Sequence, residues 1–202
     1  LKDDLNSKNI KNSINLFKYE SIVSRNPRPK DLDVFAVVSG IQFEAKFRNA
    51  IESLQRKIEI QLADTLNYMV LPSNLAVEYC VLKWPDEAYN QKSIDQALHL
   101  LKEIDIKPYV FTISGIQMHQ DGCIILRGFS ENMIIHKIRD FLRNSVDDFP
   151  KAQSRWSHVP IGRILEPINS IRKEKLTKFF DQINSDFMEF STEINQIHLV
   201  FE

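Results

Sequence analysis

The sequence lacks the features on which several classes of protein depend. It carries 26 Lys and Arg against 27 Asp and Glu in 202 residues, a net charge of −1. This balance argues against a large RNA-coating surface and leaves room only for a local basic groove. The longest apolar runs are of strand length, so we expect neither a membrane span nor a secretory signal. The chain starts at Leu1 rather than Met, which would suit a piece of a longer protein, and a cytoplasmic location is the default expectation.

Cysteine is scarce as well. The two cysteines, Cys80 and Cys123, each lie in an apolar run, 77–82 and 123–126. This pattern is typical of buried free thiols. Neither cysteine has neighbours at metal-ligand spacing. We therefore predict no metal and no cofactor.

The composition of the chain changes near residue 33. Residues 1–32 are rich in Asn, Lys and Ser, have no strong apolar stripe, and end in Asn26-Pro27-Arg28-Pro29. We interpret them as an N-terminal arm and linker, with a helical turn or two around 14–19. Residues 33–202 are predicted to form the folded domain.

Strands and helices are both expected along this domain. Apolar runs predict strands, and apolar residues three or four positions apart predict helices. Asp121-Gly122 predicts a hairpin turn, and Ser93 is expected to be a helix N-cap. The expected strands are 34–38, 68–71, 75–82, 109–113, 123–126, 156–165 and 194–201, and the expected helices are 43–63, 93–104, 132–146 and 172–183. Hairpins mixed irregularly with crossovers indicate an α+β fold.

Two segments about half the chain apart are alike. Residues 72–78 read Pro-Ser-Asn-Leu-Ala-Val-Glu and residues 157–163 read Ser-His-Val-Pro-Ile-Gly-Arg, and each enters a buried strand after a polar approach. With the order of elements over 33–202, they resemble the 2H phosphoesterase superfamily, which includes 2′-5′ RNA ligase-like proteins and cyclic-nucleotide phosphodiesterases. The resemblance implies two pseudo-symmetric lobes with mainly antiparallel sheets around a central cleft and helices outside. Each lobe of that family supplies a His-x-Thr/Ser motif to the cleft.

The sequence departs from the family pattern at three of the four motif positions. Ala76 stands where the first histidine belongs and Glu78 where the first hydroxyl belongs. The second motif keeps His158 but has Pro160 in place of its hydroxyl. In the family's mechanism one imidazole takes a proton from the attacking hydroxyl or water, and the other gives a proton to the leaving oxygen. Because Ala76 transfers no proton and Pro160 offers no donor, the resemblance implies a phosphodiester-binding protein with impaired catalysis.

Two arginines are candidate phosphate contacts. Arg163 follows Gly162 at the end of the second motif, where a guanidinium can grip a phosphate bidentately, although a surface charge is the alternative. Arg127, after the central hairpin strand, ranks second. Both positions remain compatible with a local basic groove in a chain of balanced charge.

Other polar and aromatic residues have simpler interpretations. Tyr79 and Trp84 would be able to stack a base, but aromatic residues beside a strand are more often part of the core. His119 is expected to be exposed in its loop. No partner is visible in the sequence for the remaining histidines, which are His99, His136 and His198.

Three interpretations of position 76 stay open. The chain is a natural degenerate member of the family, or Ala76 was engineered to trap an intact substrate, or Glu78 serves with His158 in a divergent enzyme. An enzyme would hydrolyse or transfer a phosphodiester without a metal, and a binding module would hold a nucleotide, cyclic phosphate or RNA end without turnover. A protein-interaction domain would instead fill the cleft with side chains and use residues 1–32. No membrane partner is expected.

Overall fold

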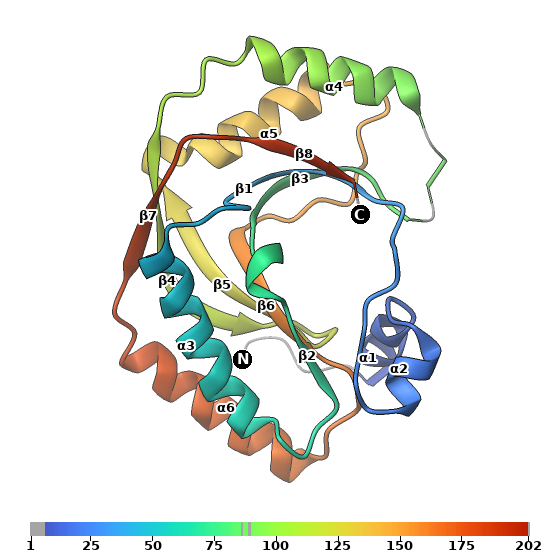
Figure 1. Ribbon diagram of the computed structural model, residues 1–202, viewed down its shortest axis with the longest axis vertical. Coiled ribbons are helices and arrows are strands. Elements are labelled where there is room, and N and C mark those ends of the chain that lie inside the picture. Colours follow the sequence, from blue (N-terminus) through green and yellow to red (C-terminus); the bar gives the residue numbers. More distant parts are fainter. Residues whose placement is uncertain (1–6, 86, 89, 202) are drawn as a thin grey trace.

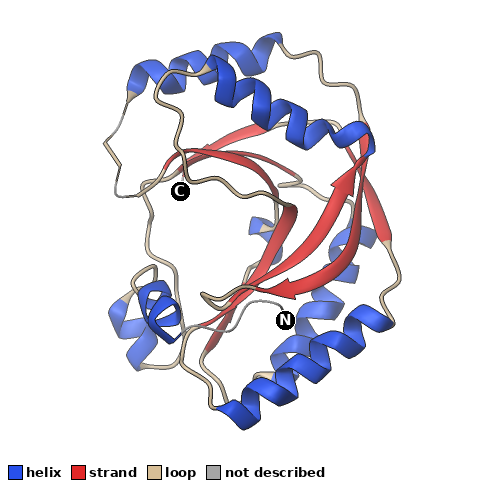
Figure 2. Ribbon diagram, turned by 180° about the vertical axis from the view of Figure 1, so that it is seen from behind, coloured by secondary structure: helices blue, strands red, loops and turns tan. Residues whose placement is uncertain are grey.

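The computed structural model describes residues 7–85, 87–88 and 90–201, and it contains two antiparallel sheets with helices on their outer sides (Figures 1 and 2). The small sheet has the strand order β3-β1-β8, and the large sheet has the order β2-β6-β5-β4-β7. These are the two lobes of the predicted α+β fold, and that prediction is confirmed. The strands are β1 (Phe35–Ser39), β2 (Asn67–Met69), β3 (Val77–Lys83), β4 (Tyr109–Met118), β5 (Cys123–Ser130), β6 (Ser157–Ile164), β7 (Phe190–Ile194) and β8 (His198–Phe201).

The helices tie the two lobes together because the chain crosses between them. The α-helices are α1 (Ser7–Ile14), α2 (Tyr19–Val23), α3 (Ala45–Gln61), α4 (Gln91–Glu103), α5 (Ile134–Ser145) and α6 (Ser170–Ser185), and the short 3-10 helices are η1 (Pro72–Asn74) and η2 (Glu131–Met133). Helix α3 follows β1 of the small sheet but packs on β2, β6 and β7 of the large sheet. Helix α5 follows β5 of the large sheet but packs on β3 of the small sheet.

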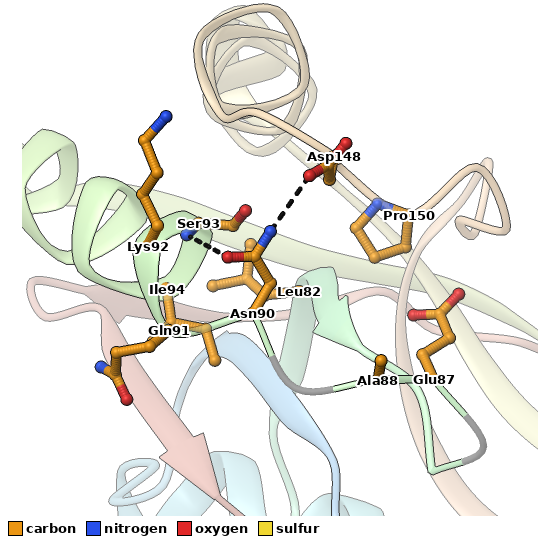
Figure 3. A pocket seen from close by; sticks show the side chains of 10 residues that line it. All are labelled: Leu82, Glu87, Ala88, Asn90, Gln91, Lys92, Ser93, Ile94, Asp148 and Pro150. Atoms are coloured by element: carbon orange, nitrogen blue, oxygen red, sulfur yellow. Dashed lines mark hydrogen bonds between the residues drawn. The ribbon is translucent and has the colours of Figure 1, made fainter.

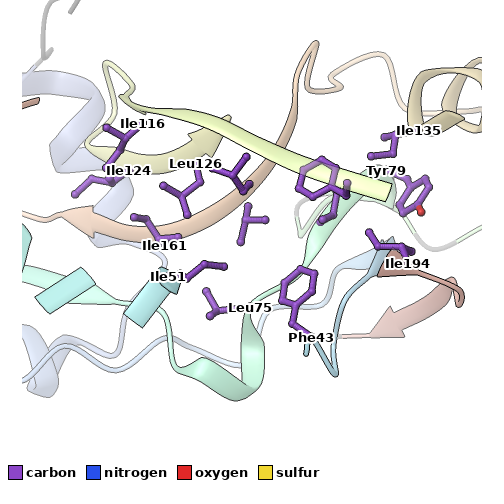
Figure 4. Packing of buried hydrophobic residues seen from close by; sticks show 14 of the residues in the cluster. Phe43, Ile51, Leu75, Tyr79, Ile116, Ile124, Leu126, Ile135, Ile161 and Ile194 are labelled. Atoms are coloured by element: carbon purple, nitrogen blue, oxygen red, sulfur yellow. The ribbon is translucent and has the colours of Figure 1, made fainter. Parts of the chain in front are cut away.

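As a result, one apolar core serves both lobes. It joins side chains of α3, such as Ile51, to Leu75 just before β3, to Tyr79 within β3, and to Leu126 and Ile161 of the large sheet (Figure 4). Burying such side chains contributes about 1.5–3 kcal/mol each, so the shared cluster strongly opposes separation of the lobes.

A buried amide also links the two predicted motif segments. Gln55 lies in the apolar stripe of α3, and its Nε2 donates hydrogen bonds of 2.8 Å to the carbonyl oxygens of both Val70 and Ile161. The Val70 amide in turn donates to the Ile161 carbonyl at 3.1 Å. These hydrogen bonds hold the segment that leads into the first motif next to β6, the strand that carries the second motif.

Two details of the predicted element order are wrong. The single closing strand expected over 194–201 is two strands, because β7 ends at Ile194 and pairs with β4, whereas β8 starts at His198 and pairs with β1. The chain changes sheets between them, and an apolar run does not reveal which sheet a strand joins. Asn90 rather than Ser93 caps α4, since the Asn90 side chain accepts the Ser93 backbone N–H at 3.3 Å.

The segment expected to form an arm is folded where it is described. Phe17 is buried and packs with Leu66 and Leu165 beside the large sheet. The hydroxyl of Ser13 in α1 donates to the Asp121 carbonyl at 2.9 Å, in the β4–β5 turn. Helices α1 and α2 lie together at one side of the molecule (Figure 1). The division of the chain at residue 33 stays a prediction.

A buried arginine holds the two motif strands at their junction. Arg139 projects from the apolar stripe of α5, where it is only 2% exposed. Its Nε donates to the Tyr79 carbonyl of β3, and its Nη2 donates to the Trp156 carbonyl before β6 at 3.0 Å. Burial lowers the pKa of Arg139, and the charge of Glu78 acts in the opposite direction. One cation therefore satisfies a carbonyl beside each motif.

Replacing this cation should cost far more stability than replacing an exposed arginine of the same helix. We expect Arg139→Ala to lower the free energy of unfolding by about 3–5 kcal/mol, because it leaves two carbonyls and a partly buried carboxylate without their cation. Arg143→Ala, which removes an exposed ion pair of 3.1 Å to Asp140, should cost less than about 1 kcal/mol. Urea unfolding measures both values, and equal small losses would show that Arg139 does not hold the junction.

Candidate functional site

Each sheet has one face on the shared core and one face turned away from it. We call the face turned away from the core the inner face. Leu126 and Val159 are opposite each other in β5 and β6 and belong to the core. Their neighbours point the other way, so the pairs Arg127–His158 and Ile125–Pro160 lie on the inner face of the large sheet. His158 and Arg127 are therefore direct cross-strand neighbours, although they are far apart in the sequence.

The small sheet presents the remains of the first motif on its own inner face. Ala76 is half-buried and packs against an apolar cluster that consists of Val34, Ala36, Val38 and Val81. Glu78 is opposite Val38, which is in turn opposite His198, so these three share the inner face. Strands β3 and β6 contact each other. The two motif strands are thus brought together, as the resemblance implies, but the side chain at position 76 adds only a methyl group.

His158 is buried and uncharged at neutral pH. It is 7% exposed, and its Nδ1 lies 3.4 Å from both the Ser154 hydroxyl and the Trp156 carbonyl. Burial lowers its pKa to about 4, the Trp156 carbonyl raises it, and the charges of His119 and Arg139 lower it further. A neutral imidazole can donate one hydrogen bond and accept another, but near pH 7 it lacks the second proton that a general acid would give up.

The low pKa of His158 makes stability fall in acid. The unfolded imidazole titrates near 6.5, so the unfolded chain binds more protons between pH 6.5 and 4, and stability is lost as the pH falls through this window. In the wild type, the free energy of unfolding should fall by about 3 kcal/mol between pH 7 and pH 4 because of His158. This contribution should be absent in His158→Asn. Urea unfolding from pH 7 to pH 4 tests this, with the exposed His99→Asn as control. A parallel pH dependence in wild type and His158→Asn would contradict it.

The two candidate arginines lie in different surroundings. Arg127 is half-buried, and within the described part of the chain its buried Nε has no hydrogen-bond partner. Its side chain extends over Gly115, where an added Cβ would come within 2.9 Å of Nη2. A larger residue at position 115 would therefore make the guanidinium shift.

Arg163 is already engaged by the protein. Its Nη1 lies 2.6 Å from the Asp121 carboxylate and 2.8 Å from the Ser13 hydroxyl, and its side chain is 19% exposed. Burial favours a raised pKa for Asp121, but Arg163 outweighs this effect and the pKa lies below its ordinary value. The guanidinium thus anchors helix α1 and the β4–β5 turn.

The secondary candidates divide between the core and the surface. Tyr79 is fully buried and its hydroxyl contacts those of Ser39 and Tyr109, so it stacks no ligand. The Trp84 indole donates to the Ala152 carbonyl at 2.9 Å. His119, expected to be exposed, is half-buried, and its position at the end of β4 brings its charge within range of His158.

The two cysteine thiols are expected to be unreactive at neutral pH. Both are free, Cys80 is buried and Cys123 is half-buried. Burial raises the pKa of Cys80 to about 12 and that of Cys123 to about 11. Neither thiolate forms readily at neutral pH, so we assign no nucleophile here.

Arg139 is the site residue that sequence reasoning missed. The available signal was a charged residue inside the apolar stripe of the helix predicted over 132–146. Such a residue must find buried partners. Its partners could not be read from the sequence, because Tyr79 and Trp156 come from different lobes.

A pocket also opens at the start of α4, away from these residues. Among its described lining residues, Asn90 bridges the Ser93 backbone and the Asp148 carboxylate, and Glu87 and Pro150 lie across from it (Figure 3). None of the six predicted site residues is among them. Its two carboxylates, Glu87 and Asp148, outnumber its one lysine, Lys92, and disfavour an anionic ligand.

Within residues 7–85, 87–88 and 90–201, no group of three or more His, Cys, Asp or Glu side chains is arranged to hold a metal ion. Over the same residues, no helix combines the length and the apolar character needed to cross a membrane.

Comparison with known proteins identifies the fold. No family model matches the sequence, and no curated protein matches it significantly. Among solved structures, Escherichia coli LigT complexed with ATP is 11% identical with a TM-score of 0.56, covering 84% of this chain and 87% of LigT. TT0787 of Thermus thermophilus is 11% identical with a TM-score of 0.57, covering 83% and 87%. Usb1 of Kluyveromyces marxianus is 7% identical with a TM-score of 0.54, covering 86% and 99%.

These structures all have the 2H phosphoesterase fold. The present chain therefore has that fold, with its two motif strands side by side at the junction of the lobes. At this level of identity the likeness concerns the fold alone.

Proposed function

We propose that this protein binds a phosphodiester ligand, a nucleotide or an RNA end, on the inner face of its large sheet and does not turn it over efficiently. The observation that carries the proposal is Arg127, which lies opposite His158 and has a buried Nε–H without an acceptor in the described chain. An unsatisfied buried donor costs about 1–3 kcal/mol. Because this Nε is inaccessible where the side chain lies, a phosphate oxygen would satisfy it with a charge-assisted hydrogen bond once the guanidinium turns outward.

The charges around the site also favour Arg127 as the residue that binds the anion. Arg139 is committed to two backbone carbonyls and to the charge of Glu78, and Arg163 is committed to Asp121. Glu78 therefore does not act on a phosphate as an uncompensated negative charge. The neutral imidazole of His158 adds one hydrogen bond beside Arg127 without adding a charge.

Efficient catalysis does not fit this arrangement. Proton transfer at both oxygens needs two groups with pKa values near the working pH. Ala76 supplies none, and the pKa of His158 lies near 4. Pro160 has no N–H or hydroxyl with which to stabilise charge as it develops.

Removing Arg127 should weaken binding without unfolding the protein. We expect Arg127→Ala to raise the Kd for ATP and for 2′,3′-cyclic AMP by about 10- to 100-fold, since charged hydrogen bonds contribute about 1.5–3 kcal/mol. ATP is a suitable first probe because LigT, which has the same fold, was crystallised with it. Isothermal titration calorimetry measures the change.

The matched control is an arginine on the outer side of the molecule. Arg56→Ala on α3 removes a 66% exposed side chain and should leave both Kd values within about twofold of wild type. Equal binding by wild type and Arg127→Ala would overturn the assignment of the phosphate to Arg127.

Restoring a histidine at position 76 should create little activity. In the family's mechanism one acid/base group is worth about 10²–10⁴ in rate, but Ala76→His would face a His158 with a low pKa and a Pro160 without a donor. We expect turnover of 2′,3′-cyclic AMP to rise by less than about tenfold, which is below that range. Chromatography of products without added metal measures it.

Two outcomes would contradict this conclusion. A gain of about a hundredfold or more in Ala76→His would show that the alanine disables an otherwise complete enzyme. Turnover by the unaltered protein that disappears in His158→Ala would identify an active enzyme, with Glu78 as the partner of His158. The control variant Ala50→His places the same substitution on the outer helix α3.

A further inference from the structure

We propose that the folded N-terminal segment, residues 7–32, is a cationic surface that binds the strand of an RNA whose end lies at Arg127. The proposal rests on the function proposed above and extends its ligand from one nucleotide to a strand of several. We call residues 7–32 the arm. Its binding surface is centred on Lys18, Arg28 and Lys30, which we call the arm patch.

Charge is divided unevenly between the arm and the rest of the chain. Residues 7–32 carry six Lys and Arg against two Asp and Glu, a net charge of +4. Residues 33–202 carry 19 Lys and Arg against 23 Asp and Glu, a net charge of −4. A chain of nearly zero net charge thus consists of a basic segment on an acidic domain. Such a segment attracts a polyanion.

The backbone of the arm brings its cations together. The Lys18 N–H donates to the Arg28 carbonyl at 2.9 Å, and Phe17 forms an antiparallel bridge with Pro29. Lys18 and Arg28 are therefore opposite each other, and Lys30 is two residues further along on the same face. Arg28 and Lys30 are exposed, and Lys18 is half-buried. Like charges directly opposite each other are destabilising.

The arm patch is not neutralised by the protein. Within the described part of the chain, no acidic side chain lies at ion-pair distance from any of its three cations. Arg25 of the arm differs, because its guanidinium is 3.2 Å from the Glu166 carboxylate. Phosphate groups would relieve the repulsion among the patch cations and release the counterions of the RNA.

One end of the inner face of the large sheet turns toward the arm. Ile124 and Ile164 belong to the core, so their neighbours Cys123 and Arg163 point to the inner face. Cys123 and Arg163 are opposite each other, and Arg163 is also opposite Tyr68 in β2. These three residues therefore share the face on which Arg127 and His158 lie.

Two contacts hold the arm on this end of the face. The Ser13 hydroxyl is 2.8 Å from Nη1 of Arg163, and the Phe17 ring packs edge-on against Tyr68 with centroids 5.3 Å apart (Figure 1). Arg127 is four residues along β5 from this end, about 13 Å at the rise of a strand. An RNA strand of a few nucleotides can therefore reach from the phosphate position at Arg127 to the arm.

A lipid surface is the alternative partner of such a patch. Tyr19 and Val23 of α2 are 79% and 65% exposed, and exposed apolar side chains beside cations also occur on membrane-binding helices. Helix α2 has five residues and is far shorter than those helices. The position of the arm on the face that carries Arg127 favours RNA.

The test compares two ligands with the same end and different lengths. The probes are 2′,3′-cyclic UMP and an octauridylate that ends in a 2′,3′-cyclic phosphate, and calorimetry at several KCl concentrations gives each Kd. Replacing Lys18, Arg28 and Lys30 together by Ala should weaken the octauridylate by about 10- to 100-fold at about 0.1 M salt. Its slope of log K against log salt should become shallower by about 2, since each contact with a single-strand phosphate contributes about 0.7. The Kd for 2′,3′-cyclic UMP should stay within about twofold.

Control variants separate the position of the charges from their number. The triple alanine variant of Lys57, Lys102 and Lys137 removes three exposed cations from α3, α4 and α5, so its net charge equals that of the arm-patch variant. It should leave both Kd values within about twofold of wild type. Lys18→Arg combined with Lys30→Arg keeps the charges of the patch and should retain the affinity for the octauridylate.

The outcomes distinguish this proposal from the one on which it rests. If Arg127→Ala weakens both probes but the arm-patch variant leaves the Kd and salt slope of the octauridylate unchanged, the arm patch is wrong and the phosphate position stands. Equal weakening of both probes by the arm-patch variant would make the role of the patch structural and would also overturn it.

Vesicles provide the test of the alternative partner. Binding of wild type to vesicles of equal parts phosphatidylserine and phosphatidylcholine, lost in the arm-patch variant while octauridylate binding is kept, would assign the patch to membranes and overturn the proposal. If wild type binds neither 2′,3′-cyclic UMP nor the octauridylate, the proposed function fails and the arm patch fails with it.

Discussion

The buried guanidinium of Arg139 is the constraint on which the rest of the site depends. It comes from α5 and reaches one carbonyl beside each motif, at Tyr79 and at Trp156. A buried cation is destabilising unless its donors are satisfied. Separating the two strands would break the hydrogen bonds of the guanidinium and is therefore unfavourable. The position of His158 on β6 and of Glu78 on β3 both follow from it. The backbone of Trp156 is fixed by the same contact.

The partners of the arginines determine which of them are available on the inner face. Arg139 and Arg163 are used by the protein itself, the first at the lobe junction and the second at the contact with α1. Arg127 differs from them because its Nε meets no partner in the described chain. Burial that organises the junction also keeps His158 neutral. The proposed anion site therefore rests on the one of these three arginines whose Nε no described group engages.

Much of the fold followed from local patterns, and little of the site did. Apolar periodicity and the Asp121-Gly122 turn predicted most elements, because strand and helix periods are encoded within a few residues. The motif comparison indicated that the segments with Ala76 and His158 belong together, and β3, which starts after Ala76, contacts β6. Arg163 was expected to meet phosphate, but its neighbours Ser13 and Asp121 are set by tertiary packing that no local pattern reveals.

The two lobes share a fold but not a chemistry. On the small sheet the inner face is mainly an apolar cluster around Val38 and Val81, into which Ala76 packs. On the large sheet the inner face carries Arg127 and His158. An imidazole at position 76 would have to fit among these apolar side chains, and enlarging a packed site costs about 1–3 kcal/mol. Ala76 is thus matched to its apolar surroundings, and the polar side chains on which the proposed binding depends lie on the large sheet.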